Sequence, residues 1–318
     1  MNVRRRLISA AAAATVTALG IATLTACGGD ATAAGTGRFD VVASFYPMAF
    51  LADRIGGNHV HVTSLTSPGQ EPHDLEISPK QIIGIEKSDA VLYLKNLQPS
   101  VDAAVAQSSV GTKIDAASLT TLEQHGNEVG GHAASHDTSK NEEASGLDPH
   151  IWLDPVRYAQ VAEGVGKAFE KADPEHAADY RKNTAALVEQ LDALDTAFKD
   201  GLAHTRTKVF ITTHAAFGYL AERYGLTEEA INGLDPESEP SAARVKDLET
   251  MARADGVSTV FYETLVSDKT ARTIAADAGL RTDVLDPIEG ITGKSRGKDY
   301  FAVQQANLKA LRTALGAK

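Results

Sequence analysis

The chain has 318 residues, of which 43% are hydrophobic and 23% charged, and its formal net charge is −11. This acidity argues against nucleic acid as a partner and against a basic membrane-binding face. Because Cys27 is the single cysteine, an intramolecular disulfide is excluded.

The first 26 residues have the pattern of an export signal. Three arginines at positions 4–6 precede an apolar, Ala-rich run over 7–24, and small residues follow. The break Leu24-Thr25-Ala26-Cys27 resembles the lipobox of bacterial lipoproteins, which predicts a lipid on Cys27. An uncleaved transmembrane anchor is the alternative, and the weak apolarity of the run disfavours it. The arginines also loosely fit a twin-arginine signal, so the export route stays open.

Residues 27–38 have no apolar pattern and are predicted to form a flexible tether. The remaining body of roughly 280 residues has room for two domains. We predict an N-terminal lobe over 39–172, a linker helix over 173–205 and a C-terminal lobe over 206–318.

The N-terminal half begins with alternating strands and helices. Hydrophobic patterning and helix-start signals predict a strand at 39–44, a helix at 47–56, a strand at 59–63, a helix from Pro79 and a strand at 90–94. This order favours a parallel sheet with helices on both faces. His59 and His61 share the polar face of their strand, so we interpret them as surface or lobe-interface residues. The loop after that strand delivers His73.

The polar stretch 120–145 interrupts this order. His125, His132 and His136 lie there among acidic residues. A long segment without secondary structure is usually functional or disordered, and His-rich tracts can bind metal loosely. A solvated acidic loop explains the same composition, and both interpretations stay open.

The segment Gly146–Pro155 holds the single tryptophan and places His150 between two Asp-Pro steps. Each proline restricts the residue before it to extended geometry, so the backbone around His150 is stiff. Asp154 is a good N-cap and Pro155 a good first helical residue, which predicts a helix over 155–171. A second helix is expected from Pro174 to about Ala203. It would span roughly 45 Å, which suits a strut between two lobes.

The second half repeats the alternation of strands and helices. Strands are expected at 208–212, 257–262 and 282–285, and a last helix over 299–315.

His214 and Asp286 each follow one of these strands closely. In open α/β sheets, ligands collect at the carboxyl ends of the strands, so His73, His150, His214 and Asp286 could face one interlobe cleft. Three imidazoles and one carboxylate make a tetrahedral set suited to Zn²⁺. Scattered surface histidines and a turn aspartate are the alternative.

Five motifs give the chain a resemblance to the zinc/manganese solute-binding lipoproteins of bacterial ABC importers, the ZnuA-like group. They are Ala43-Ser44-Phe45-Tyr46-Pro47, Glu71-Pro72-His73-Asp74, Asp148-Pro149-His150-Ile151-Trp152-Leu153, Thr213-His214-Ala215-Ala216-Phe217 and Leu285-Asp286-Pro287. The resemblance covers the whole mature chain. It implies two α/β lobes with mainly parallel sheets, joined by one long helix, with the metal between them. It places His73, His150, His214 and Asp286 on the four ligand positions.

The resemblance implies an extracytoplasmic, membrane-anchored lipoprotein that captures Zn²⁺ and delivers it to an ABC permease as a monomer. A manganese-binding member of the same family, a zinc-dependent hydrolase and an adhesin-type lipoprotein are the alternatives. The hydrolase is disfavoured because a catalytic zinc keeps one position open for water, whereas four protein ligands close the site. Glu263, at the end of a strand, could orient a ligand imidazole, or it could be purely structural.

Overall fold

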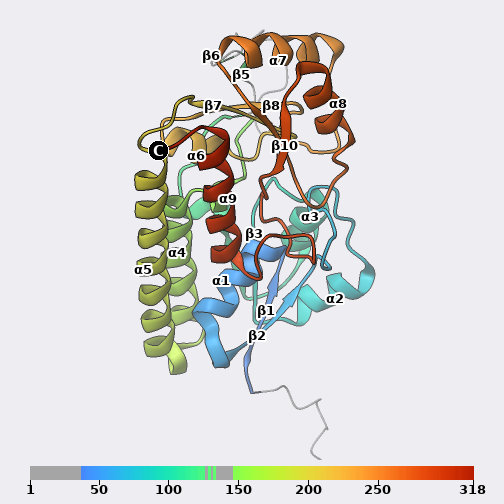
Figure 1. Cartoon of the computed structure of the whole chain (residues 1–318). Helices are drawn as coiled ribbons and strands as arrows, with labels where there is room; N and C mark the ends of the chain where they lie inside the picture. Colours follow the sequence, from blue (N-terminus) through green and yellow to red (C-terminus); the bar gives the residue numbers. More distant parts are fainter. Residues whose placement is uncertain (1–36, 126–127, 130–131, 134–145) are drawn as a thin grey trace, which may run out of the picture. The chain divides into compact units, whose positions relative to one another are not determined.

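The computed structural model describes residues 37–125, 128–129, 132–133 and 146–318 (Figure 1). The predicted export signal and the lipid site at Cys27 lie outside these residues, as do nearly all of the tether and most of the polar loop. Residues Arg38–Lys318 form one unit by their internal contacts. Within the part of the chain that the structure describes, no helix combines the length and the apolarity needed to cross a membrane.

The first half builds a four-stranded parallel sheet with the order β2-β1-β3-β4. Its elements are β1 (Phe39–Ala43), α1 (Tyr46–Gly56), β2 (Val60–Ser64), α2 (Pro79–Lys87), β3 (Ala90–Tyr93), α3 (Pro99–Gln107), β4 (Thr112–Asp115) and α4 (Pro155–Ala172). The alternation of strand and helix that the sequence predicted is thus present. Two elements were not predicted, namely α3 and β4.

The second half builds another four-stranded parallel sheet, with the order β10-β9-β7-β8. Its elements are β7 (Val209–Thr212), α6 (Gly218–Arg223), β8 (Thr227–Ala230), α7 (Ala242–Ala254), β9 (Thr259–Tyr262), α8 (Lys269–Ala278), β10 (Arg281–Val284) and α9 (Tyr300–Ala314). Two parallel-sheet α/β lobes with flanking helices therefore confirm the predicted fold class.

Each strand of the N-terminal sheet sends alternate side chains to opposite faces, as a pleated strand must. Val41 and Ala43 of β1 join the main core, whereas Val42 between them joins a separate cluster with Ile85 of α2. The main core is continuous across both halves, because it also contains residues of α6 and α9. The two lobes therefore share buried apolar surface.

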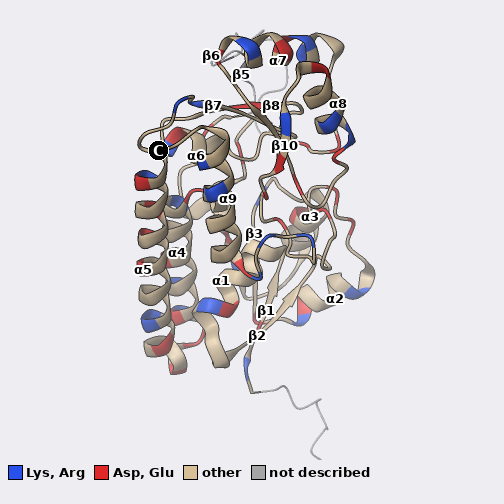
Figure 2. Ribbon diagram, viewed as in Figure 1, with Lys and Arg blue, Asp and Glu red and all other residues tan. Residues whose placement is uncertain are grey.

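The predicted long helix is α5 (Ala177–Leu202), preceded by one 3₁₀ turn at Pro174–His176. Its buried stripe contacts α4 and α1 of the first half and α9 of the second half. Gly166 of α4 allows a close approach to Thr184 of α5, since a Cβ there would collide with that side chain. Charged residues of both signs are spaced along the rest of α5, as expected for a solvated face (Figure 2).

His59 and His61 lie where the sequence placed them, outside the core. Nε2 of His59 is 2.8 Å from Oδ2 of Asp179 on α5, and its ring stacks on His176. His61 is half exposed and lies 3.2 Å from Asp40. Within the polar loop, two residue pairs form a short antiparallel ladder, β5 (Glu128–Val129) with β6 (His132–Ala133).

Candidate metal centre

His150 is held by the residues that precede it in the sequence. Asp148 is fully buried, and its Oδ1 accepts hydrogen bonds from the backbone N–H of His150 at 2.9 Å and from Nδ1 at 2.7 Å. A 3₁₀ turn (Ile151–Leu153) and then α4 follow, with Asp154 accepting from the N–H of Val156 as the predicted N-cap. Buried residues on both sides of His150 thus hold its imidazole in place.

His214 is held in a similar way at the end of β7. Glu263, directly after β9, places Oε1 2.8 Å from Nδ1 of His214 and accepts from the hydroxyl of Thr213 at 2.6 Å. Below this loop, buried Glu228 of β8 contacts Oγ1 of Thr212 at 2.7 Å and accepts from the N–H of Phe217. Glu263 therefore has the geometry of an orienting carboxylate, one of the two roles that the sequence left open for it.

His73 comes from the loop after β2, and its side chain is 12% exposed, more than those of His150 and His214. Oε2 of Glu71 accepts from its backbone N–H at 2.9 Å and fixes the turn. Among the described residues, no hydrogen bond to Nδ1 of His73 is present, in contrast to the other two histidines.

The acidic member of the group is Glu289 and not Asp286. Oδ1 of Asp286 accepts from the N–H of Ile288, and its Oδ2 accepts from the hydroxyl of Thr264 at 3.2 Å. Ile288 has φ +60°, an uncommon conformation for a β-branched residue, and the chain turns there. The turn directs the side chain of Glu289, three residues further on, toward the histidines. We therefore replace Asp286 by Glu289 in the ligand set, with Asp286 holding the turn.

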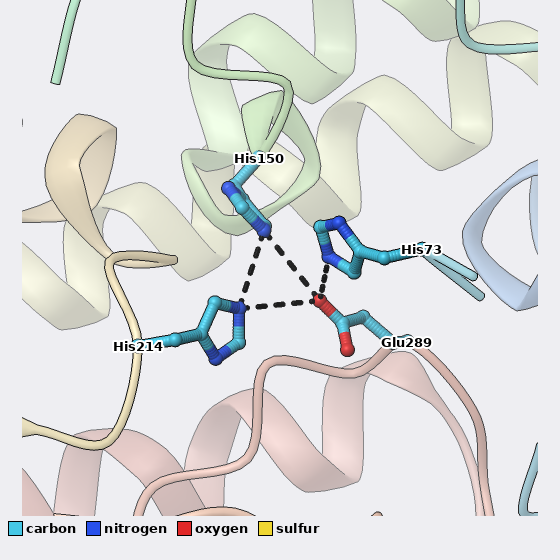
Figure 3. Close-up of side chains that lie close together, drawn as sticks. All are labelled: His73, His150, His214 and Glu289. Carbon is cyan, nitrogen blue, oxygen red and sulfur yellow. Dashed lines mark hydrogen bonds and ion pairs between the residues drawn. The ribbon is translucent and has the colours of Figure 1, made fainter. Parts of the chain in front are cut away.

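The three imidazoles and Glu289 converge on one point (Figure 3). Oε1 of Glu289 lies 3.2 Å from Nε2 of His73, 3.5 Å from Nε2 of His150 and 3.6 Å from Nε2 of His214. The Nε2 atoms of His150 and His214 are 3.4 Å apart. His150, His214 and Glu289 are almost fully buried, so these four atoms can interact strongly with one another and with a common ligand.

Buried charges set the protonation of this group. Burial raises the pKa of Asp148, but hydrogen bonds from His125 and His150 outweigh burial and hold that pKa below its ordinary value. Burial lowers the pKa of His214, yet Glu263 and then Glu289 raise it well above the ordinary value. Burial likewise opposes ionisation of Glu289, but its hydrogen bonds to the three histidines hold its pKa well below the ordinary range.

This donor set fits a divalent metal ion. When Asp148 and Glu263 accept the Nδ1 protons of neutral imidazoles, the Nε2 lone pairs of His150 and His214 face each other and an ionised carboxylate. Such a cluster of acceptors is repulsive unless a proton or a cation lies among them. Carboxylate–histidine pairs of this kind typically orient metal ligands. Oε2 of Glu289, which is also buried, has no hydrogen-bond partner among the described residues.

Trp152, in the segment that carries His150, links the two halves of the chain beside the metal centre. Nε1 of Trp152 donates to the carbonyl of Pro287 at 2.6 Å, and the hydroxyl of Tyr300 donates to the carbonyl of Trp152 at 2.6 Å. The backbone that carries His150 is therefore bonded directly to the turn that carries Glu289.

Two contributors escaped sequence reasoning. Sequence reasoning assigns no role to Asp148, although it stands two residues before His150 and can reach its ring. Glu289 lies in Asp286-Pro287-Ile288-Glu289-Gly290, so a second carboxylate was available in the same loop. The backbone turn at Ile288, which the sequence does not reveal, separates the two acids.

The fold thus combines two parallel-sheet lobes, a long helix packed against both and a buried cluster of three histidines and one glutamate. The chain belongs to the family described as "Zinc-uptake complex component A periplasmic", whose model matches residues 41–314. It is 36% identical over 292 residues to the zinc-binding protein AdcA of Streptococcus pyogenes, covering 87% of this chain and 56% of that protein. The chain thus spans about half the length of the streptococcal relatives it matches.

Other relatives match over nearly their whole length. The high-affinity zinc uptake system protein ZnuA of Bacillus subtilis is 31% identical over 308 residues, covering 92% of this chain and 94% of that protein. The crystal structure of the Zn(II)-bound ZnuA-like domain of Streptococcus pneumoniae AdcA is 32% identical with a TM-score of 0.72. That match covers 88% of this chain and 99% of the domain.

Proposed function

We propose that this protein is the extracytoplasmic zinc-binding component of an ABC importer, which captures Zn²⁺ and delivers it to a membrane permease. The convergence of Nε2 of His73, His150 and His214 with Oε1 of Glu289 carries this proposal. The zinc-binding relatives from Streptococcus and Bacillus support it.

Zinc is favoured over manganese by the chemistry of the donors. Three imidazole nitrogens and one carboxylate oxygen suit an ion that accepts nitrogen readily and is stable with four ligands. Manganese prefers carboxylate-rich sites with more than four donors, and it also lies below zinc in the general order of affinities. His214 is decisive here, because an acid at that position would make the set richer in oxygen.

We propose binding and release rather than catalysis. A hydrolytic zinc has three protein ligands and an open position for water, whereas the four ligands proposed here complete a tetrahedron. Burial of three of the four ligands also leaves little room for an organic substrate beside the ion.

We propose further that lobes 39–172 and 206–318 are joined by the helical segment 173–205, and that a lipid on Cys27 anchors the monomeric protein outside the cytoplasmic membrane. The lipobox-like sequence before Cys27 motivates the anchor. Fractionation of cells that express Cys27→Ala tests it. The variant should be released from the membrane fraction, and a variant that stays membrane-bound with unchanged processing would refute the anchor.

The direct test of function is a titration of purified, metal-stripped protein with Zn²⁺ and Mn²⁺ in competition with a chelator. We expect one tight zinc per chain, much weaker manganese, and loss of tight zinc binding in His214→Ala. His204→Ala is the matched control, because His204 is exposed and lies outside the centre. A wild-type preference for manganese, or undiminished zinc binding in His214→Ala, would reject the proposed site.

A further inference from the structure

One buried carboxylate touches two histidines, of which only one belongs to the proposed metal centre. Oδ1 of Asp148 accepts from Nδ1 and the backbone N–H of His150, while Oδ2 lies 3.0 Å from Nδ1 of His125. Asp148 is fully buried and His125 is 9% exposed. The carboxylate is therefore fixed from both sides, with one oxygen on each imidazole.

His125 is itself enclosed by residues of the second half. A Cβ at Gly218, the first residue of α6, would lie 2.5 Å from Cβ and from Cγ of His125 and 3.0 Å from Oδ2 of Asp148. The ring of Tyr219 packs edge-on against His125 at 4.5 Å between centroids, and its hydroxyl donates to the carbonyl of Asp148 at 2.7 Å. Glycine at 218 thus makes the space in which the pair of His125 and Asp148 fits.

We propose that His125 is a positioning residue of the metal centre, which acts through Asp148 on the ligand His150. The hydrogen bond from Nδ1 of His125 to Oδ2 fixes the rotation of the carboxylate. The other oxygen then stays on Nδ1 of His150, and Nε2 of His150 keeps its lone pair directed at the metal. This inference rests on the proposed function, because it assigns a role toward the zinc bound there.

A different role for His125, as a ligand of a second metal ion, is less well supported by its surroundings. Glu123, His125 and Glu222 offer ligand atoms close enough for one ion. However, the guanidinium of Arg157 bonds to Glu123 and lies 3.8 Å from Glu222, so a fixed positive charge already occupies the environment of these acids. The contact between Nε2 of His125 and Glu222, at 3.5 Å, is also longer than the contact between Nδ1 of His125 and Asp148, at 3.0 Å.

The test compares two amides of similar chemistry at position 125 in the full, metal-stripped chain. The amide nitrogen of Asn can occupy the place of Nδ1, whereas that of Gln reaches the place of Nε2, away from Asp148. Zinc affinity by chelator competition and the visible absorption spectrum of bound Co²⁺ are measured for wild type, His125→Asn and His125→Gln, with His204→Ala as control. Thermal melts of the metal-free proteins report folding separately.

We expect His125→Gln to bind zinc about tenfold more weakly and to shift the Co²⁺ spectrum, since loss of an orienting partner typically costs that much or more. His125→Asn should keep both properties near wild type. Equal behaviour of the two variants, whether both unchanged or both weakened, would overturn the inference, as would loss of only a second, weaker zinc in both. Failure of the wild type itself to bind zinc would instead reject the proposed function.

Discussion

The three histidines of the centre are supported in two different ways. His150 and His214 are buried, and each has a carboxylate on Nδ1, from Asp148 and Glu263 respectively. His73 comes from a loop whose backbone bonds to Glu71, and its side chain is 12% exposed, more than those of the other two histidines. Two imidazoles are thus each held by a buried carboxylate on Nδ1, whereas the third is held through its backbone and through Glu289.

The largest effect expected from this difference concerns folding without metal. His150→Ala and His214→Ala each break a buried pair of imidazole and carboxylate, which should lower the free energy of unfolding by about 3–5 kcal/mol. His73→Ala leaves Glu289 with two histidines and should cost about 1 kcal/mol or less. Urea unfolding in chelator measures this. Equal losses in all three variants would remove the distinction between the two kinds of support.

Glu228, the buried acid below the loop that carries His214, should change its protonation as pH is varied. Asp148, which holds His150, should stay ionised over the same range. Burial raises the pKa of Glu228 to about 7. The folded state therefore favours the protonated acid, and stability falls as pH rises from the unfolded pKa near 4.5 to about 7. Glu228→Gln keeps the neutral hydrogen bonds to Thr212 and Phe217, so it should be more stable than wild type at pH 8, by on the order of 3 kcal/mol.

At pH 4 the same variant and the wild type should have nearly equal stability, because Glu228 is then protonated in the folded state and mostly protonated in the unfolded state. Chemical denaturation of the metal-free proteins at the two pH values measures the difference. A pH-independent effect of Glu228→Gln would show that Glu228 does not titrate as the structure indicates.

The orienting carboxylates should matter for affinity more than exposed acids do. Asp148→Asn and Glu263→Gln should each weaken zinc binding 10- to 100-fold, about 1.4–2.7 kcal/mol, because the imidazoles lose their fixed orientation. Glu239→Gln is the control, since Glu239 is exposed and lies outside the centre. Zinc competition titrations compare the three. Wild-type affinity in both orienting variants would contradict the account.

The smallest effect is expected from the polar loop. Its remaining histidines have no rigid framework in the sequence, so they should bind metal weakly and tune capture only. Replacing 126–145 by a short glycine linker, with His125 retained, should leave one tight zinc per chain and change affinity less than about threefold. Titration calorimetry measures the number of tightly bound zinc ions per chain. Loss of the one tight zinc on this replacement would show that the main site lies in the loop.

The parts of the molecule that sequence reasoning predicted are those governed by local chemistry. Asp154 caps α4 and Pro155 opens it because these roles depend on neighbouring residues alone. β8, by contrast, has the sequence Thr227-Glu228-Glu229-Ala230, which no hydrophobic pattern identifies as a buried strand. Glu228 is accommodated by Thr212 and the backbone of Phe217, and Glu229 by Arg244. These partners are distant in the sequence, so only the fold reveals them.

The choice between the two acids of the last ligand loop shows the same limit. Asp286 follows the strand more closely and therefore matched the rule that ligands gather at strand ends. The left-handed conformation of Ile288 and the bond from Trp152 to Pro287 place Glu289 there instead. Both depend on packing between the halves of the chain.

The central claim is that His73, His150, His214 and Glu289 together bind one zinc ion. A crystal structure of the zinc-loaded protein, with anomalous scattering recorded at the zinc edge, tests it most directly. We predict a single strong peak with three Nε2 atoms at about 2.0–2.1 Å and an oxygen of Glu289 at about 2.0–2.2 Å. A zinc ion bound by Asp286 in place of Glu289, or no anomalous peak among the three histidines, would contradict the account.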